Sequence, residues 1–199
     1  MLPAIILAAG ASRRMGRPKA LLPAEGGRPF VAQIVRTLAA AGLEEIVVVT
    51  GPDHDAIADA VAQDRPPVSP RFARNPEPER GQLSSLWVGM DAALRPSSEG
   101  MLVTLVDVPG ITPAVVSAVV EAWRRTRAPI VRPAIGERHG HPVVFDRAVF
   151  GELRAAPLDA GAKAVVRAHA RDILDVPVSD EGCLIDVDTP ADYRQLLSG

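Results

Sequence analysis

The sequence predicts an α/β fold with a largely parallel sheet, and three observations support this prediction. Short apolar runs alternate with segments in which apolar residues recur at helical spacing. The chain has 199 residues, of which 47% are hydrophobic, so it can bury one sizeable core. No repeat, linker or low-complexity tract divides it. We therefore expect a single domain over residues 1–199.

The expected strands are apolar runs bounded by turn-forming residues. Residues 46–50 have the sequence Ile-Val-Val-Val-Thr, which is typical of a buried strand, and they end in the turn Gly51-Pro52-Asp53. Residues 101–106 give the strongest strand signal in the chain. In chain order the expected strands are residues 5–7, 46–50, 72–74, 101–106, 129–131, 142–145 and 184–187.

The expected helices follow from apolar stripes and from residues that begin or end a helix. Four apolar residues between positions 29 and 41 share one stripe, and Gly42 is expected to end this helix. Asp53 or Asp55 can cap the helix that runs through Val61. The remaining expected helices cover residues 84–94, 113–125, 147–155, 160–170 and the segment from 190.

The composition limits the expected partners and compartment. A formal net charge of -2 gives no electrostatic basis for binding nucleic acid or an anionic membrane. The single cysteine, Cys183, excludes an internal disulfide and a multi-cysteine zinc site, and we expect it to be a small buried residue beside a strand. No apolar run is long enough to span a membrane, and no export signal precedes the first strand. These features predict a cytoplasmic protein.

The loop after the first strand is rich in small residues and cations. Residues 7–19 read Leu-Ala-Ala-Gly-Ala-Ser-Arg-Arg-Met-Gly-Arg-Pro-Lys, so main-chain N–H groups can approach a polyphosphate that Arg13, Arg14 and Lys19 neutralise. A Walker A loop is excluded because no Gly-Lys-Ser/Thr occurs, and the spacing of Gly10 and Gly16 excludes G-x-G-x-x-G. The alternative is a glycine-rich turn with exposed cations. We predict a nucleotide-binding loop.

An acidic residue, Asp107, ends the strongest strand. Ligands of open α/β sheets bind outside the carboxyl ends of the strands, so Asp107 is expected to face the same crevice as the first loop. A carboxylate there can hold Mg²⁺, which keeps several waters and bridges to phosphates. The alternative is that Asp107 stabilises the turn before Pro113.

Two further carboxylates, Asp186 and Asp188, flank Val187. Strand alternation would place both on one face, with Val187 turned away. Two like charges repel unless a cation or water separates them, which favours a metal role for at least one. The alternative is that Asp188 or Thr189 caps the final helix, with Pro190 in its first turn.

The segment Gly81-Gln82-Leu83-Ser84-Ser85 begins an expected helix. Free N–H groups and two hydroxyls at such a position can hydrogen-bond a base edge or a ribose. In isolation the same segment is an ordinary helix start. His139 and His141 lack a third partner in the sequence, so they do not support a zinc site.

The pattern Leu-Ala-Ala-Gly-x-Ser-x-Arg-Met-Gly-x-x-Lys resembles the signature loop of the nucleotidyltransferases of molybdenum cofactor maturation. Ala9 is more similar to the cytidylyltransferase branch than to the guanylyltransferase branch, which tends to carry Gly-Gly there. The resemblance extends from Leu7 to Tyr193. It implies a three-layer α/β/α, Rossmann-like nucleotidyltransferase fold with a mostly parallel mixed sheet, whose N-terminal half mainly binds nucleotide and whose C-terminal half mainly binds the acceptor.

The resemblance also implies roles for individual residues. Asp107 matches the family's metal-binding Asp-x-Pro, although Val108 stands where the cytidylyltransferase branch often has Gln. Asp188 would be the second metal ligand and Asp186 the reserve. The implied catalytic residues are Arg14, Lys19 and Asp107. The implied nucleotide-binding residues are Leu7, Ala8, Ala9, Gly10, Ser12, Arg13, Arg14, Lys19, Gly81, Ser84 and Ser85. The implied acceptor-binding residues are Gly140, His141, Pro142 and Lys163, with His141 donating a hydrogen bond to the acceptor phosphate.

The implied reaction is Mg²⁺-dependent transfer of CMP from CTP to the phosphate of molybdopterin, with release of pyrophosphate. Transient contact with a molybdoenzyme would follow. The alternatives are a guanylyltransferase, a sugar-phosphate nucleotidyltransferase, and a non-catalytic accessory protein that binds nucleotide or pterin. Retention of Lys19, Asp107 and Asp188 argues against the accessory protein, since a pure binder needs no metal beside the α-phosphate.

Overall fold

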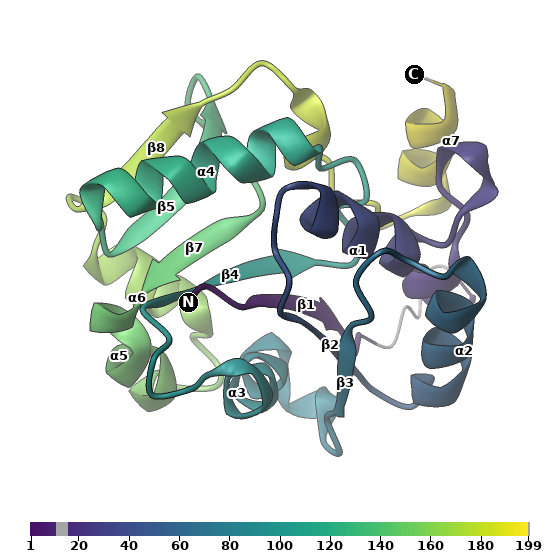
Figure 1. Ribbon diagram of the computed structural model, residues 1–199, viewed down its shortest axis with the longest axis horizontal. Helices are drawn as coiled ribbons and strands as arrows, with labels where there is room; N and C mark the ends of the chain where they lie inside the picture. Colours follow the sequence, from purple (N-terminus) through teal and green to yellow (C-terminus); the bar gives the residue numbers. More distant parts are fainter. Residues whose placement is uncertain (11–15, 199) are drawn as a thin grey trace.

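Eight strands form one twisted sheet (Figure 1), in the order β3-β2-β1-β4-β7-β5-β6, with β8 also paired to β5. The computed structural model describes residues 1–10 and 16–198, and the structural statements below concern those residues. The strands are β1 (Ala4–Ala8), β2 (Ile46–Thr50), β3 (Arg71–Arg74), β4 (Gly100–Leu105), β5 (Ile130–Ile135), β6 (Arg138–His139), β7 (Val143–Asp146) and β8 (Ile173–Pro177).

The sheet is mixed but mostly parallel, as the sequence predicts. β3, β2, β1 and β4 run parallel to their neighbours, whereas β7 lies antiparallel between β4 and β5. β5 and β8 are again parallel. Because the carboxyl ends of β1, β2 and β4 meet at one edge, the loops that follow them are brought together there.

Helices cover both faces of the sheet and give three layers (Figure 1). Alternating side chains of the strands enter two separate clusters. Ile6 and Leu102 pack with helices α1 and α4, while Ile5 and Met101 pack with α3 on the opposite face. The helices are α1 (Phe30–Ala40), α2 (His54–Asp64), α3 (Gln82–Ala93), α4 (Pro113–Thr126), α5 (Phe150–Ala155), α6 (Ala162–Ala168) and α7 (Pro190–Ser198).

The end of α1 illustrates how local sequence sets an element. Gly42 has φ +82°, the left-handed conformation that glycine adopts without strain. Its N–H donates to the carbonyl of Ala39 at 3.0 Å, and that of Leu43 donates to Leu38 at 3.1 Å. This pair of bonds is a Schellman motif, so Gly42 ends the helix as predicted.

The predicted strand at residues 184–187 is wrong. Glu181–Leu184 form a short 3₁₀ helix, and the next residues are irregular. They bond to loops rather than to a strand edge: the carbonyl of Cys183 accepts from His141 N–H at 2.9 Å, and Val187 N–H donates to the carbonyl of Asp107 at 2.7 Å. Cys183 is buried as expected, but it lies in the 3₁₀ helix.

The strand that the prediction missed is β8, together with the two-residue β6. β8 has the sequence Ile-Leu-Asp-Val-Pro, which lacks a continuous apolar run. Among the described strands it pairs with β5 alone, and its side chains are partly or fully exposed. Proline in a strand is typical of such edge positions. Within the described residues no helix is both long and apolar enough to cross a membrane.

Candidate functional site

The centre of the site is the ammonium group of Lys19, which lies between two carboxylates. Its Nζ donates to Asp188 Oδ1 at 2.5 Å and to Asp107 Oδ2 at 3.1 Å. Burial opposes the charge of Lys19, but the hydrogen bond to Asp188 and the nearby charge of Asp107 outweigh it and raise the pKa of the lysine. A cation therefore separates the two like charges, as their proximity requires.

Asp107 is held at this position by the loop after β4. Its carbonyl accepts from the N–H of Val187, which joins the two acidic segments. Its Oδ1 is buried and has no hydrogen-bond partner among the described residues. A buried carboxylate oxygen without a partner is costly, so this atom is a free ligand for a cation.

Asp188 is placed by the start of α7. The carboxylate of Asp192 accepts from the N–H groups of Asp188 at 3.1 Å and Thr189 at 2.7 Å, while Thr189 Oγ1 accepts from Asp192 N–H at 3.3 Å. This reciprocal capping box is the alternative that the sequence left open for Thr189. It leaves the side chain of Asp188 to contact Lys19.

The third carboxylate, Asp186, lies on the same side of the chain as Asp188, although no strand is present. Val187 between them is fully buried, so the expected alternation holds. Burial and the charges of Asp107 and Asp188 raise the pKa of Asp186. Within the described ranges no group of three or more His, Cys, Asp or Glu side chains surrounds one point. A divalent cation on Asp107 and Asp188 would complete its shell with water and phosphate oxygens, which suits Mg²⁺ or Mn²⁺.

The predicted phosphate loop begins at the end of β1. Ala8 and Ala9 are buried and Gly10 is exposed. Gly51, which follows β2, packs directly on this segment, and a Cβ at Gly51 would lie 2.8 Å from the carbonyl oxygen of Ala9. Glycine is required there because two loops meet backbone to backbone. The predicted residues Ser12, Arg13 and Arg14 lie outside the described residues.

The start of α3 lies beside the same loops, since α3 packs on β1 and β2. Gly81 has φ +99° and ψ 176°, a conformation that is essentially restricted to glycine. Ser84 and Ser85 are buried, and both hydroxyls accept hydrogen bonds from Asn75 Nδ2 at 3.0 Å. The predicted roles of the serines at a base or ribose stay predictions.

Asn75 is a buried polar residue that the sequence analysis did not select. It follows β3, and its N–H donates to the carbonyl of Thr50 at the end of β2. Its Oδ1 accepts from the N–H of Glu77 at 3.0 Å. The signal that could have identified it is a polar residue directly after a strand end, in Arg74-Asn75-Pro76.

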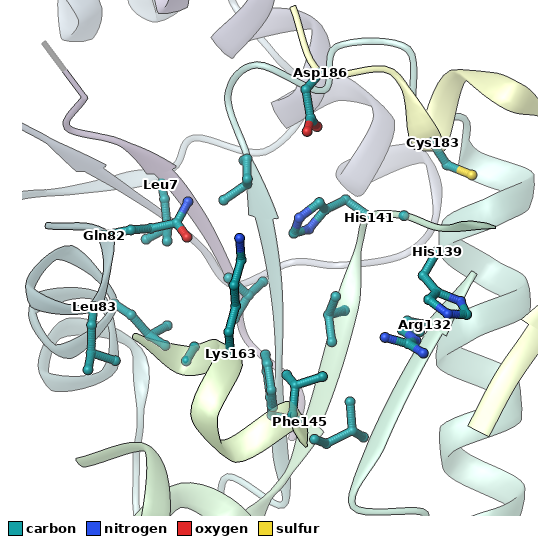
Figure 2. A pocket seen from close by; sticks show the side chains of 18 of the residues that line it. Leu7, Gln82, Leu83, Arg132, His139, His141, Phe145, Lys163, Cys183 and Asp186 are labelled. Atoms are coloured by element: carbon teal, nitrogen blue, oxygen red, sulfur yellow. The ribbon is translucent and has the colours of Figure 1, made fainter. Parts of the chain in front are cut away.

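A cavity of about 300 Å³ is lined at one end by the third carboxylate, Asp186 (Figure 2). Most of its lining is apolar, with Val103, Val143 and Phe145 from the central strands. The polar lining groups are Gln82, Arg132, His139, His141, Lys163 and Asp186. The predicted acceptor residues Gly140, His141 and Lys163 all line this cavity; Pro142 follows His141 through a cis peptide bond.

The wall at Gly140 is a close contact between two loops. A Cβ at Gly140 would overlap the carbonyl oxygen of Cys183, so no larger residue fits. Burial lowers the pKa of His141, opposed by the backbone of Val103 and the charge of Asp107, so its ring is neutral at pH 7. Its buried Nδ1 has no hydrogen-bond partner in the described part of the chain.

Comparison with known proteins identifies the family. Residues 4–173 match the MobA-like NTP transferase domain. The chain belongs to this family.

This MobA-like NTP transferase resembles proteins with different names. It is 33% identical to the nicotine blue oxidoreductase of Paenarthrobacter nicotinovorans, over 97% of this chain and 95% of that protein. It is 30% identical to the probable molybdenum cofactor guanylyltransferase of Mycobacterium avium, over 98% of this chain and 94% of that protein. The crystal structure of Rv0371c from Mycobacterium tuberculosis has a TM-score of 0.82 and 28% identity, and covers all of both chains.

The family places the chain among the nucleotidyltransferases, as the resemblance implied. The fold prediction is confirmed as well, since solved nucleotidyltransferases share the architecture. Members of this family use a divalent metal, and a second structure of Rv0371c, with a TM-score of 0.79, is a complex with manganese. The curated relatives named above include a guanylyltransferase but no cytidylyltransferase, so the choice of nucleotide is not fixed by them.

Proposed function

We propose that this MobA-like NTP transferase transfers a nucleoside monophosphate, CMP in the first instance, from its triphosphate to the phosphate of molybdopterin. The observation that carries the proposal is the pair of carboxylates on Asp107 and Asp188, held around one cation at the carboxyl edge of the sheet. Leu7 of β1 and Asp186, two residues before Asp188, line a mostly apolar cavity. A phosphate at the mouth of that cavity would be placed for in-line attack.

The proposed reaction requires positioning and charge neutralisation more than acid–base chemistry. An oxygen of the acceptor phosphate forms a bond to the α-phosphorus. The bond from that phosphorus to the bridging oxygen of the β-phosphate breaks, and pyrophosphate leaves with the electron pair. A divalent cation held by Asp107 and Asp188, with Asp186 in reserve, would supply charge neutralisation at the α-phosphate when bound.

The residues of the chain bind and orient both substrates in this proposal. N–H groups of Leu7, Ala8, Ala9 and Gly10 approach the phosphates, and Ser12, Arg13 and Arg14 are proposed to bind the same phosphates. Lys19 neutralises the triphosphate and the leaving pyrophosphate, as a mobile ammonium that can exchange its carboxylate partners for phosphate oxygens. Gly81, Ser84 and Ser85 form the wall beside the base and ribose.

The acceptor occupies the cavity in this proposal. Gly140, His141, Pro142 and Lys163 surround its phosphate-bearing end, and the apolar side chains of the central strands contact its body. Such a lining excludes water from the attacking oxygen, which limits hydrolysis of the triphosphate. The lining suits a flat, weakly charged ring system better than a sugar, whose hydroxyls would need polar partners.

The choice of CTP rests on Ala9, at the position where the guanylyltransferase branch tends to carry glycine. Val108, in place of the Gln common in the cytidylyltransferase branch, weakens this choice, and the Mycobacterium avium relative is named a guanylyltransferase. Calorimetric titration of CTP, GTP and ATP with Mg²⁺ distinguishes the two, using the wild type and Asp107→Ala. Selective binding of CTP that depends on Asp107, followed by CMP transfer to molybdopterin, supports the proposal. Preference for GTP moves the protein to the guanylyl branch, and absence of triphosphate binding contradicts nucleotidyl transfer.

A second candidate function is an oxidoreductase activity on an aromatic compound, favoured by the 33% identity to the nicotine blue oxidoreductase and by the apolar cavity. Oxidation of NADH or NADPH in the presence of aromatic dyes tests it. The carboxylate pair argues for nucleotidyl transfer, since hydride transfer has no use for a divalent cation at the phosphates. Turnover of a reduced nicotinamide with no transfer to molybdopterin would favour the second candidate.

A further inference from the structure

Two polar residues that line the cavity, Arg132 and His139, have no role in the proposed nucleotidyl transfer. Arg132 on β5 and His139 on β6 lie side by side in the lining, across the cavity from Leu7 and Gln82 (Figure 2). Both contact one carboxylate on the neighbouring strand β8. Arg132 Nε donates to Asp175 Oδ1 at 2.6 Å, and His139 Nδ1 lies 3.6 Å from the same oxygen.

The contact with Asp175 uses only one nitrogen of the Arg132 guanidinium. In the described part of the chain the two terminal nitrogens, Nη1 and Nη2, have no hydrogen-bond partner. The side chain is 18% exposed and lines the cavity, where a ligand can reach it. A ligand that accepts from both nitrogens would form two hydrogen bonds there in place of water.

The orientation of the guanidinium follows from the sheet. Arg132 and Asp175 are register partners of the parallel strands β5 and β8, so the hydrogen bond joins directly opposed residues. Arg132 and Ile130 alternate onto the same face, and both line the cavity. Asp175 therefore fixes the plane of the guanidinium, and its remaining paired N–H groups form a rigid two-donor edge.

The position of Arg132 defines the length of the ligand. Asp107 follows β4, and Arg132 lies on β5, with β7 between them. Neighbouring strands are about 4.8 Å apart, and the register places Arg132 level with Val103, four residues before Asp107. With a rise of about 3.3 Å per residue, Arg132 and Asp107 are separated by roughly 15 Å. The lining between them is apolar, through Val103, Val143 and Phe145. A ligand that spans this distance has a phosphate at one end and a flat apolar body in the middle.

We propose that Arg132 determines acceptor specificity by binding the end of the acceptor remote from its phosphate, at a planar heteroaromatic edge with two adjacent hydrogen-bond acceptors. The ring carbonyl and adjacent ring nitrogen of an oxidised pterin form such an edge, and arginine pairs with the equivalent edge of guanine. In a reduced pterin that nitrogen carries hydrogen, and the two lone pairs of the carbonyl oxygen accept from the two N–H groups instead. Because Asp175 already neutralises Arg132, the favoured partner is a neutral edge rather than a carboxylate. This inference rests on the proposed function and names the part of the acceptor that the site recognises.

Asp175 and His139 act as positioning residues in this proposal. Asp175 holds the guanidinium, and His139 borders it on the side of β6. Replacement of Asp175 by Asn would keep a weaker hydrogen bond to Nε but would remove the neutralising charge. The Asp175→Asn variant is therefore expected to raise the KM for the acceptor while the KM for the triphosphate stays constant.

The test compares Arg132→Met, Arg132→Lys and the wild type in two assays. Ligand-observed NMR measures binding of free pterin, a probe that needs no nucleotide and no catalysis. Steady-state kinetics measures KM for molybdopterin and for the triphosphate. Arg124→Met, on the exposed part of α4, is the control for loss of an arginine. Circular dichroism and triphosphate binding confirm that each variant is folded.

The expected result is a 10- to 100-fold weaker affinity for pterin and a similar rise in acceptor KM in Arg132→Met, with kcat and triphosphate KM unchanged. Arg132→Lys should recover little, because lysine keeps the charge but lacks the paired N–H edge. If transfer to molybdopterin occurs and Arg132→Met keeps the wild-type acceptor KM, the inference is wrong while the proposed function stands. If no transfer occurs but pterin binding depends on Arg132, the proposed function fails, and of the inference only the binding of a pterin by Arg132 stands. Absence of pterin binding to the wild type overturns the inference.

Discussion

Lys19 Nζ lies 2.5 Å from Asp188 Oδ1, although the two residues are 169 positions apart in the chain. The same ammonium lies 3.1 Å from Asp107. One lysine of the first loop thus joins the end of β4 to the start of α7, at the point where a divalent cation would bind. The lysine and the metal compete for the same carboxylates, so metal binding and movement of Lys19 toward the triphosphate should be coupled.

Replacement of Lys19 by Met should have opposite effects on the two ligands. Without nucleotide, Mn²⁺ should bind about tenfold more tightly because its competitor is gone, whereas the triphosphate should bind about tenfold more weakly because a charge-assisted contact is lost. Electron paramagnetic resonance of free Mn²⁺ and calorimetry with CTP or GTP measure the two effects. Arg124→Met is the control. Unchanged triphosphate affinity would show that the loop has been misinterpreted.

Replacement of Asp107 by Ala should reduce turnover by at least about 100-fold while leaving the fold intact. The reason is that Asp107 supplies a buried carboxylate oxygen with no partner in the described protein, which makes it the strongest candidate for a metal ligand. Rate measurements at saturating Mg²⁺ test the loss of turnover, and thermal unfolding of the variant tests whether the fold is intact. Wild-type activity in Asp107→Ala would show that Asp107 is not a metal ligand needed for turnover.

Replacement of Gly51 by Ala should weaken triphosphate binding although Gly51 carries no side chain. The added Cβ would lie 2.8 Å from the carbonyl oxygen of Ala9, so the phosphate loop must move. Gly151→Ala is the matched control, because nothing lies within 4 Å of its Cβ and it is in helix α5. Alanine there should raise stability by about 0.5–1 kcal/mol. Calorimetry and thermal melts compare the pair; equal triphosphate affinity in both variants would contradict the close contact.

Asp64 should make stability depend on pH. Its carboxylate accepts from Arg28 at 2.7 Å and Arg36 at 2.5 Å, and these bonds outweigh burial and lower the pKa of Asp64 below its usual value. The unfolded chain then binds the proton more readily, so the stabilisation is fully present above a pH of about 4 and is lost as the pH falls through the lower folded-state pKa.

Asp64→Asn should therefore cost about 1–2 kcal/mol at pH 7, and the difference from the wild type should shrink as the pH is lowered below about 4. Urea unfolding at pH 7, 4 and 3 measures this. Asp91→Asn is the control, because the Asp91–Arg154 pair is exposed and should contribute little. A difference that stays constant across this pH range would exclude ionisation of Asp64 as its cause.

The sequence predicted most elements of the fold because their signals are local. The buried strands at the centre of the sheet have continuous apolar runs. Helix α1 is followed by Gly42, whose left-handed backbone conformation favours glycine. β8 was missed because it is a partly exposed edge strand, in which the charged residue Asp175 and Pro177 interrupt the apolar pattern. Residues 184–187 have the apolar pattern of a strand, but no strand edge lies beside them, and their backbone bonds to loops instead.

By itself, the sequence determined the family, the nucleotidyltransferase class and the identity of the charged residues, because these depend on motifs of consecutive residues. Tertiary structure alone decided that Lys19 lies between Asp107 and Asp188, and that Asp175 holds Arg132 at the far end of the cavity. These contacts join segments that are 43 to 169 positions apart. Their geometry is set by the order and register of the strands, which no local pattern of residues encodes.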